Sequence, residues 1–364
     1  MKLIESLNLN NIRGDITGGI TAAIVALPFA LAMGLASGAG AEAGLYGAII
    51  TGFFAAIFGG TPAQVSGPTG PMTIVMSLIV TKYLALYPDT GLALAFFTVF
   101  LAGMFQICFG LLKLGKYINL MPHAVISGFM TGIGVIIIVL QLPQILGFYE
   151  IKGSTLNIFS ELGNVGQLFS NFGAISLAIM TLIIIYLLPK RITKIIPSPL
   201  VALTFGTLIL LILPEYFASN SEPYSQMILG DIPTGLPSFQ LPSIELSIIS
   251  EVIISALTLA ILGSIDSLLT SLVADEITRT HHDSNKELIG QGIGNTLSGL
   301  FGGLPGAGAT MRTMANVKAG GFTPISGSLH AILLLIIVLG GGKFASHIPL
   351  AVLGAILVKV GTDI

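Results

Sequence analysis

Long apolar segments recur along the whole chain and decide what it can fold into. About 20 apolar residues are needed to cross the hydrocarbon core of a bilayer. Only 9% of the 364 residues are charged and 53% are hydrophobic, whereas about a quarter of the residues in a soluble domain are charged. The sequence therefore predicts an all-α polytopic membrane protein with about 12 spans. The predicted spans are residues 16–36, 44–60, 71–87, 91–112, 124–146, 173–188, 198–214, 247–272, 288–304, 309–318, 324–340 and 347–360.

The distribution of lysine and arginine orients this stack of spans. Cytoplasmic loops carry an excess of both residues. One side holds Lys2, Arg13, Lys113, Lys116, Lys190, Arg191, Lys194, Arg279, Lys286 and Lys318, and the other holds only Lys82, Lys152 and Lys343. We therefore expect a multi-pass protein of the plasma (inner) membrane, surrounded by lipid, with a cytoplasmic N-terminus.

Composition excludes several other classes of protein. The net charge of −2 gives no indication of nucleic-acid binding, and the single cysteine, Cys108, excludes an intrachain disulfide. The polar start, residues 1–15, is too long for a signal peptide and is expected to be a cytoplasmic segment. The sequence suggests no Ser-His-Asp, Cys-His or metal-type histidine arrangement, so we expect neither an enzyme nor a cofactor.

A short motif occurs twice and predicts the architecture. The stretch AIFGGTP at 56–62 is echoed by GLFGGLP at 299–305. Each copy ends a span and is followed by a linker of small residues and a short helix. The two copies fall on the second and ninth spans, so the repeated units cross the membrane in opposite directions, which is an inverted repeat. A second unit of full length would extend past residue 364, and we interpret the chain as C-terminally truncated.

The two interrupted spans predict a site for a small anion. Half-helices of inverted-repeat transporters point their N-termini at the bilayer midplane, where unpaired amides and the helix dipole attract negative charge. Thr69 and Thr310 are placed to cap these half-helices or to donate hydroxyl hydrogens. The alternative is that the glycine motifs only allow close packing of ordinary helices.

Two charged residues fall inside the membrane. Arg312 lies in the first turn of the second half-helix, where it either reinforces the anion site or extends to the cytoplasmic side. Asp266 lies within a long span, and Thr270 shares its helical face. Such hard oxygen ligands suit a small cation, although Asp266 could instead carry a proton or form an ion pair with Arg312.

Other polar stretches have simpler interpretations. The glycine pattern GQGIGN at 290–295 lacks the strand and helix context of a dinucleotide site. The stretch THHDSNKE at 280–287 is interpreted as a solvated cytoplasmic loop. Gln64, Ser66 and Gln106 could face a substrate path or could simply pack between helices.

The chain resembles the SulP family of anion transporters. The resemblance is carried by NIRGDITGGITAAIVALPFALAMGLASGAGAEAGLYGA (11–48), FGGTPAQVSGPTGPMT (58–73), SIDSLLTSLVADEITRTHHDSNKELIGQGIGN (264–295), GLFGGLPGAGATMRT (299–313) and the C-terminal IPLAVLGAILVKVGTDI. It implies a fourteen-helix, seven-plus-seven inverted-repeat fold. The implied core domain is 16–112 with 247–340, the gate domain is 121–214 with the start of its second half at 347–364, and 215–246 is an extracellular connection. The last two spans and the cytoplasmic STAS domain of the family are absent from the sequence.

The resemblance also implies an activity and a set of ligands. The activity is Na⁺-coupled bicarbonate uptake, and the full-length protein is expected to be a homodimer. The implied anion site comprises Thr69, Gly70, Ala309, Thr310 and Arg312, and the implied sodium site comprises Asp266, Thr270, Gly308 and Thr310. Because many relatives carry arginine at the position of Arg312, a preference for sulfate or another small anion stays open. Proton-coupled transport, exchange-type transport and a passive anion channel also stay open.

Overall fold

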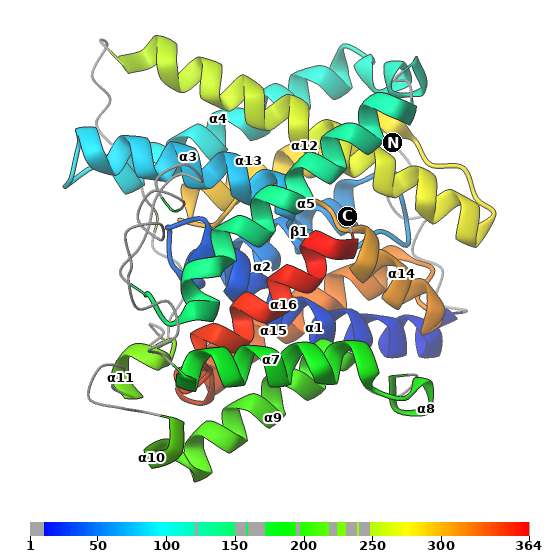
Figure 1. Ribbon diagram of the computed structural model, residues 1–364. Helices are drawn as coiled ribbons and strands as arrows, with labels where there is room; N and C mark the ends of the chain where they lie inside the picture. Colours follow the sequence, from blue (N-terminus) through cyan, green and yellow to red (C-terminus); the bar gives the residue numbers. More distant parts are fainter. Residues whose placement is uncertain are drawn as a thin grey trace.

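The computed structural model describes residues 11–120, 123–149, 158, 172–193, 197–217, 224–230, 239 and 248–363. Residues 1–10 and most of the predicted connection at 215–246 lie outside these ranges. Helices account for every predicted span, so the all-α prediction is confirmed (Figure 1). Four of the described helices, α1, α2, α4 and α12, are long and apolar enough by themselves to cross a membrane.

The described helices occur in the following order along the chain. The first half contains α1 (Ile12–Ala36), α2 (Ala41–Phe58), α3 (Gly70–Leu86), α4 (Gly91–Leu111), the 3₁₀ helix η2 (Leu114–Leu120), α5 (His123–Leu146), α7 (Phe172–Leu187), α8 (Lys190–Thr193) and α9 (Ser198–Ile212). The second half contains α10 (Pro214–Phe217), α11 (Tyr224–Met227), α12 (Ile249–Thr278), α13 (Ser284–Leu300), α14 (Thr310–Lys318), α15 (Pro324–Ala345) and α16 (Leu350–Asp363).

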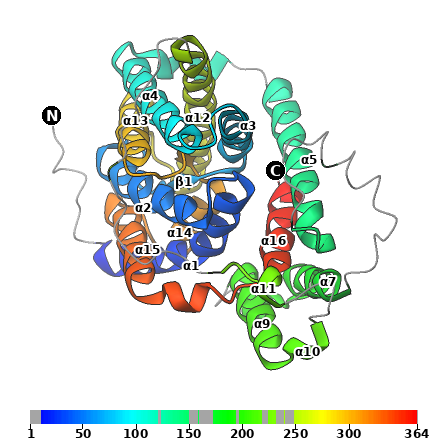
Figure 2. The same cartoon turned by 90° about the vertical axis from the view of Figure 1, so that its left-hand side faces the viewer.

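The long helices pack as two groups that lie side by side (Figure 2). In one group α13 packs against α4 and α2, α15 packs against α2 and α1, and α12 packs against α4. In the other group α16 packs against α5 and α7, and α7 packs against α9. The first group combines helices from both predicted repeats. The assignment of these groups as core and gate domains stays a prediction.

Two short strands connect the repeats at the centre of the first group. Strand β1 (Ser66–Pro68) pairs antiparallel with β2 (Gly306–Gly308), and Gly67 lies opposite Ala307. Each strand lies between an FGG motif and a short helix. Pairing between the strands gives backbone groups partners that an interrupted helix cannot supply, which is obligatory in lipid.

The stretch at 280–287, predicted to be a solvated cytoplasmic loop, differs from its prediction. Helix α13 begins at Ser284 rather than at residue 288, because the Asp283 carboxylate accepts hydrogen bonds from the amides of Asn285 and Lys286, both at 3.1 Å. The interpretation of this stretch as wholly solvated is wrong, because Glu287 is buried. Helix α12 likewise continues to Thr278, beyond the predicted end at residue 272.

The same loop holds an arrangement that the sequence did not suggest. Asp275 Oδ2 lies 2.7 Å from His282 Nδ1, and His282 Nε2 lies 2.9 Å from Ser284 Oγ. The expectation that no Ser-His-Asp arrangement occurs is therefore wrong, since these three side chains contact one another in that order. Since Ser284 is the first residue of α13, these contacts close the turn between α12 and α13.

The N-terminal helix also begins earlier than predicted. Helix α1 starts at Ile12 rather than at residue 16 and includes Asp15, which is buried. The Asp15 carboxylate accepts hydrogen bonds from the amides of Phe322 and Thr323, both at 2.9 Å. Asp15 therefore attaches the start of α1 to the start of α15.

Glycines allow α13 to contact its neighbours backbone to backbone. A Cβ added to Gly292 would lie 2.7 Å from the carbonyl oxygen of Gly103 and 2.7 Å from the amide nitrogen of Ile107, both on α4. A Cβ added to Gly294 would lie 3.0 Å from Cα of Thr51 on α2. The GQGIGN stretch is therefore part of a packed helix, and the decision against a dinucleotide loop is confirmed.

We predict that Gly292→Ala destabilises the protein by about 1–3 kcal/mol, because backbone atoms cannot move aside as a flexible side chain can. The matched control is Gly132→Ala in α5, where an added Cβ would meet nothing within 4 Å. The control should be neutral or slightly stabilising, since alanine is the better helix former. Thermal unfolding in detergent measures both, and equal midpoints for the two variants would contradict the packing argument.

Candidate anion and cation site

A small cavity lies where the two half-helices begin. Its volume is about 110 Å³. It is lined by Phe29, Met33, Pro68, Thr69, Gly70, Pro71, Asp266, Gly308, Ala309, Thr310, Met311, Arg312 and Val360. All five predicted anion-site residues are among them, together with Asp266 and Gly308 of the predicted sodium site. The structure therefore brings the two predicted sets of residues together, while their roles as ligands stay predictions.

The threonines at the half-helix starts do not cap their helices. Thr69 occupies the N-cap position of α3, but its hydroxyl donates to Asp266 Oδ2 at 2.6 Å. Ala309, rather than Thr310, is the N-cap residue of α14, and Thr310 Oγ1 lies 2.9 Å from Thr270 Oγ1. The capping alternative is wrong, because both hydroxyls point to α12, whereas the alternative of a hydroxyl donor holds for Thr69. The starts of α3 and α14 thus receive no side-chain cap, and Gly70, Thr310 and Met311 at these starts line the cavity.

We call the linker 59–69 between α2 and α3 the first break, and the linker 301–309 between α13 and α14 the second break. Several oxygen atoms lie where α12 contacts the second break. Thr270 Oγ1 donates to the carbonyl oxygen of Gly308 at 2.9 Å, and the Gly308 amide donates to Ser267 Oγ at 3.1 Å. Asp266 and Thr270 are one turn apart on α12, and both are buried. Carboxylate, hydroxyl and carbonyl oxygens are the ligands that a hard cation prefers. The four predicted sodium-site residues therefore have oxygen atoms of the kinds that bind a hard cation such as Na⁺.

Arg312 is buried between the two breaks rather than extended towards the membrane surface. Its Nη2 donates to the carbonyl oxygen of Pro68, and its Nη1 has no hydrogen-bond partner among the described residues. Gly67 lies beside the guanidinium, since an added Cβ would be 2.5 Å from Nη1, and its φ of +150° is one that residues with a side chain rarely adopt. The alternative in which Arg312 reaches the cytoplasmic side is wrong.

Asp266 and Arg312 line the same cavity. No direct ion pair joins them in the part of the chain that the structure describes. They are nevertheless close enough for their charges to attract each other. The cavity therefore has a carboxyl group and a guanidinium group on its wall.

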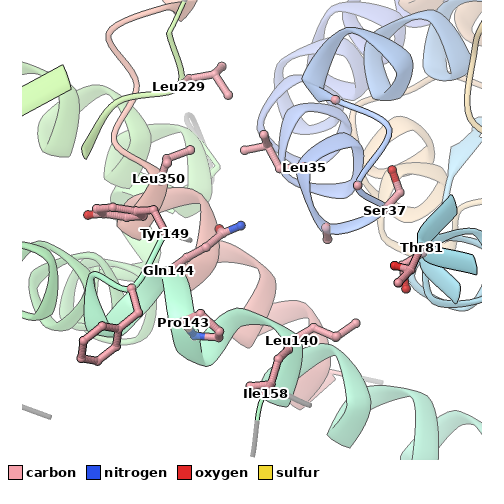
Figure 3. A pocket seen from close by; sticks show the side chains of 15 residues that line it. Leu35, Ser37, Thr81, Leu140, Pro143, Gln144, Tyr149, Ile158, Leu229 and Leu350 are labelled. Carbon is pink, nitrogen blue, oxygen red and sulfur yellow. The ribbon is translucent and has the colours of Figure 1, made fainter. Parts of the chain in front are cut away.

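The structure has two larger cavities besides the site. One of about 300 Å³ shares Phe29, Thr310, Met311 and Val360 with it and continues along Ser198 and Lys359. The other, of about 360 Å³, shares no lining residue with it. Figure 3 shows this second cavity between Leu35, Ser37 and Thr81 of one helix group and Leu140, Gln144 and Leu350 of the other. The site therefore adjoins the cavity of about 300 Å³.

The sequence analysis did not identify three polar residues of α13 that contact the two breaks. Glu287, Gln291 and Asn295 of α13 are buried and hydrogen-bonded to the two breaks. Their i, i+4, i+8 spacing was readable, but the predicted start of the helix at residue 288 excluded Glu287. For Gln64, Ser66 and Gln106 the packing interpretation holds, because each is buried and hydrogen-bonded to this row of residues.

Comparisons with known proteins identify the family. The model of the sulfate permease family matches residues 12–364. The chain belongs to this family. Among relatives, it is 51% identical to the bicarbonate transporter BicA of Synechocystis sp. over all of its own length and 63% of the relative's length. It is 36% identical to the putative sulfate transporter YvdB of Bacillus subtilis, with 87% and 58% of the two chains covered.

A solved structure of a family member has the same fold. The transmembrane domain of a cyanobacterial bicarbonate transporter BicA superposes with a TM-score of 0.91 at 51% identity, covering 98% of this chain and 89% of that one. The predicted family and the predicted inverted-repeat transporter fold are therefore confirmed. The chain spans less than two thirds of the length of these curated relatives.

We predict that Thr69→Val destabilises the protein by about 1–3 kcal/mol, because it leaves the buried Asp266 carboxylate without its hydroxyl donor. Thr69→Ser keeps the hydroxyl and should retain most of the stability. Thermal unfolding of the two variants makes the comparison, and a Thr69→Val variant as stable as Thr69→Ser would show that this hydrogen bond contributes nothing.

Proposed function

We propose that this chain is the membrane part of a secondary active transporter that takes up bicarbonate together with Na⁺. The observation that carries the proposal is the single cavity that has both half-helix starts, Arg312 and Asp266 on its wall. The 51% identity to a protein named as a bicarbonate transporter supports the choice of substrate. The chain is not proposed to be an enzyme.

The positive groups of the cavity account for anion binding. Each half-helix start contributes about half a positive charge without any side chain, and Arg312 adds a full one. The unpaired Arg312 Nη1 and the first amides of α3 and α14 supply hydrogen bonds to an oxyanion. A cavity of about 110 Å³ admits an anion of a few heavy atoms.

The carboxylate of Asp266 accounts for coupling to Na⁺. Asp266 repels an anion in the same cavity and offsets the charge of Arg312. A Na⁺ ion held by Asp266, Thr270, Gly308 and Thr310 neutralises that carboxylate, so the anion binds more tightly when Na⁺ is present. Coupling of this kind is reciprocal, and the anion must also increase the affinity for Na⁺.

Sulfate is the second candidate substrate. Arg312 gives the site more positive charge than the helix starts alone, and a dianion benefits more from that charge than a monoanion does. A relative at 36% identity is named as a putative sulfate transporter. Competition by sulfate in the same uptake assay therefore decides between the two anions.

Transport also requires access to the site from both sides. In the predicted topology the cavity of about 300 Å³ that adjoins the site faces the cytoplasm, and the cavity of about 360 Å³ faces outwards. We propose that the two helix groups move against each other as rigid bodies. This movement would connect the site in turn to the one cavity and to the other. A plasma-membrane location with a cytoplasmic N-terminus and a homodimeric full-length protein belong to the same proposal.

We predict that an inward Na⁺ gradient drives uphill uptake of labelled bicarbonate into vesicles at constant pH, and that excess sulfate competes weakly. The measurement is initial uptake with Na⁺ or with K⁺ outside. Uptake that ignores Na⁺ and follows a pH gradient would replace the proposal with proton coupling. Flux with single-channel conductance and no uphill accumulation would replace it with a channel.

Asp266→Asn should abolish Na⁺ stimulation while leaving the fold intact, because asparagine keeps an oxygen that accepts from Thr69 and loses only the charge. The control is Glu251→Gln on the same helix, a partly exposed carboxylate that pairs with Lys82 at 2.8 Å. The control should keep wild-type Na⁺ dependence. Retained Na⁺ stimulation in Asp266→Asn would remove Asp266 from the cation site.

A further inference from the structure

Helix α13 has a row of polar side chains on one face. Glu287, Gln291, Asn295 and Ser298 recur at helical spacing and are at most 1% exposed. None of them lines the candidate cavity. A buried polar row in a membrane helix needs partners, because unsatisfied polar groups are costly there. The partners of this row are the two breaks.

The first break is held by Glu287. Its Oε2 accepts hydrogen bonds from the amides of Gly60 and Thr61, both at 2.9 Å. Its Oε1 accepts from Gln64 Nε2 at 2.7 Å and from Gln291 Nε2 at 2.8 Å. Four donors thus converge on two oxygens, and among the described ion pairs none includes this carboxylate. Backbone and amide dipoles therefore compensate its charge.

The second break is held by Asn295. Its Oδ1 accepts from the Gly306 amide at 2.7 Å, and its Nδ2 donates to the Gly306 carbonyl oxygen at 2.8 Å. Ser298 Oγ donates to the carbonyl oxygen of Leu304 at 2.8 Å. Between the two breaks, Gln291 Nε2 donates to Ser66 Oγ of β1 at 2.6 Å. One helix face thus contacts both linkers and the strand pair.

A short chain of contacts leads from Glu287 to the candidate cation site. Gln64, which donates to Glu287, accepts at Oε1 from Ser271 Oγ at 3.0 Å. The amide group of Gln64 also packs against Gly308, where an added Cβ would lie 2.6 Å from Gln64 Cδ. Gly308 in turn accepts from Thr270. Gln64 therefore lies between Glu287 and Gly308.

We infer that α13 is the frame that fixes the two half-helix starts relative to each other, and that Glu287 is a positioning residue for the cation site. Glu287 acts through Gln64 on Gly308 and does not itself bind the ion. The transport part of this inference rests on the proposed function. The frame itself is a property of the fold and can be tested without any transport.

The first test is Glu287→Gln, which replaces one acceptor oxygen by an NH₂ group among four donors. Hydrogen–deuterium exchange at the Gly60 and Thr61 amides should become faster in this variant. The Na⁺ concentration for half-maximal uptake should rise about tenfold or more, as for other residues that orient metal ligands, with a smaller change in the maximal rate. Glu276→Gln, an exposed carboxylate near the end of α12, is the matched control and should change neither quantity.

The second test is Asn295→Ser, which releases the other break. Exchange at Gly306 should become faster while Gly60 and Thr61 stay protected, which keeps the inference testable if Glu287→Gln folds poorly. Wild-type exchange at the breaks in both variants, or equal loss of protection over all of α12 and α13, would overturn the inference. If wild-type uptake ignores Na⁺, the proposed function fails, whereas the exchange measurements still decide whether α13 is the frame.

Discussion

Backbone groups that leave a helix inside a membrane must find partners in the protein, and this requirement shapes the centre of the molecule. Two linkers between helices lie side by side, and some of their backbone groups pair with each other through the β1–β2 pair. Glu287 and Asn295 of α13 accept hydrogen bonds from further linker amides, those of Gly60, Thr61 and Gly306. Once these groups are paired, the first amides of α3 and α14 remain at the wall of the cavity. The interruptions remove helical hydrogen bonds, and the free helix starts add positive charge to the cavity. They do so without a lysine or arginine side chain, which is costly to place inside a membrane.

In the proposed mechanism, the charges of this cavity make the binding of two ligands interdependent. Arg312 is fixed by the carbonyl oxygen of Pro68, and Asp266 is fixed by the hydroxyl of Thr69. The two partners are consecutive residues, at the end of β1 and directly before α3, yet the two charged groups do not form a direct ion pair. In the proposed mechanism a cation neutralises Asp266 and leaves the field of Arg312 and the helix starts to the anion. The physical basis of coupling would then be local electrostatics, without a long pathway between distant sites.

The sequence was informative where a pattern has one physical reading. Apolar length predicted the spans, and the repeated FGG motif predicted paired interruptions with Thr69 and Thr310 at their ends. It was uninformative where a side chain had a choice of partners. Both threonines could reach their own helix or α12, and only the packing of α12 decides between them. Glu287 follows a run of polar residues that is typical of solvated loops, so its burial depends on the cap at Asp283 and on the contact of α13 with the first break.

In the proposed mechanism an anion and Na⁺ occupy neighbouring positions and stabilise each other. Equilibrium binding of radiolabelled Na⁺ to the purified protein, with and without saturating bicarbonate and at constant pH, tests this most directly. We predict that bicarbonate raises the affinity for Na⁺, and that Na⁺ raises the affinity for bicarbonate by the same factor. Affinities for Na⁺ that are identical in the presence and absence of bicarbonate would contradict the mechanism.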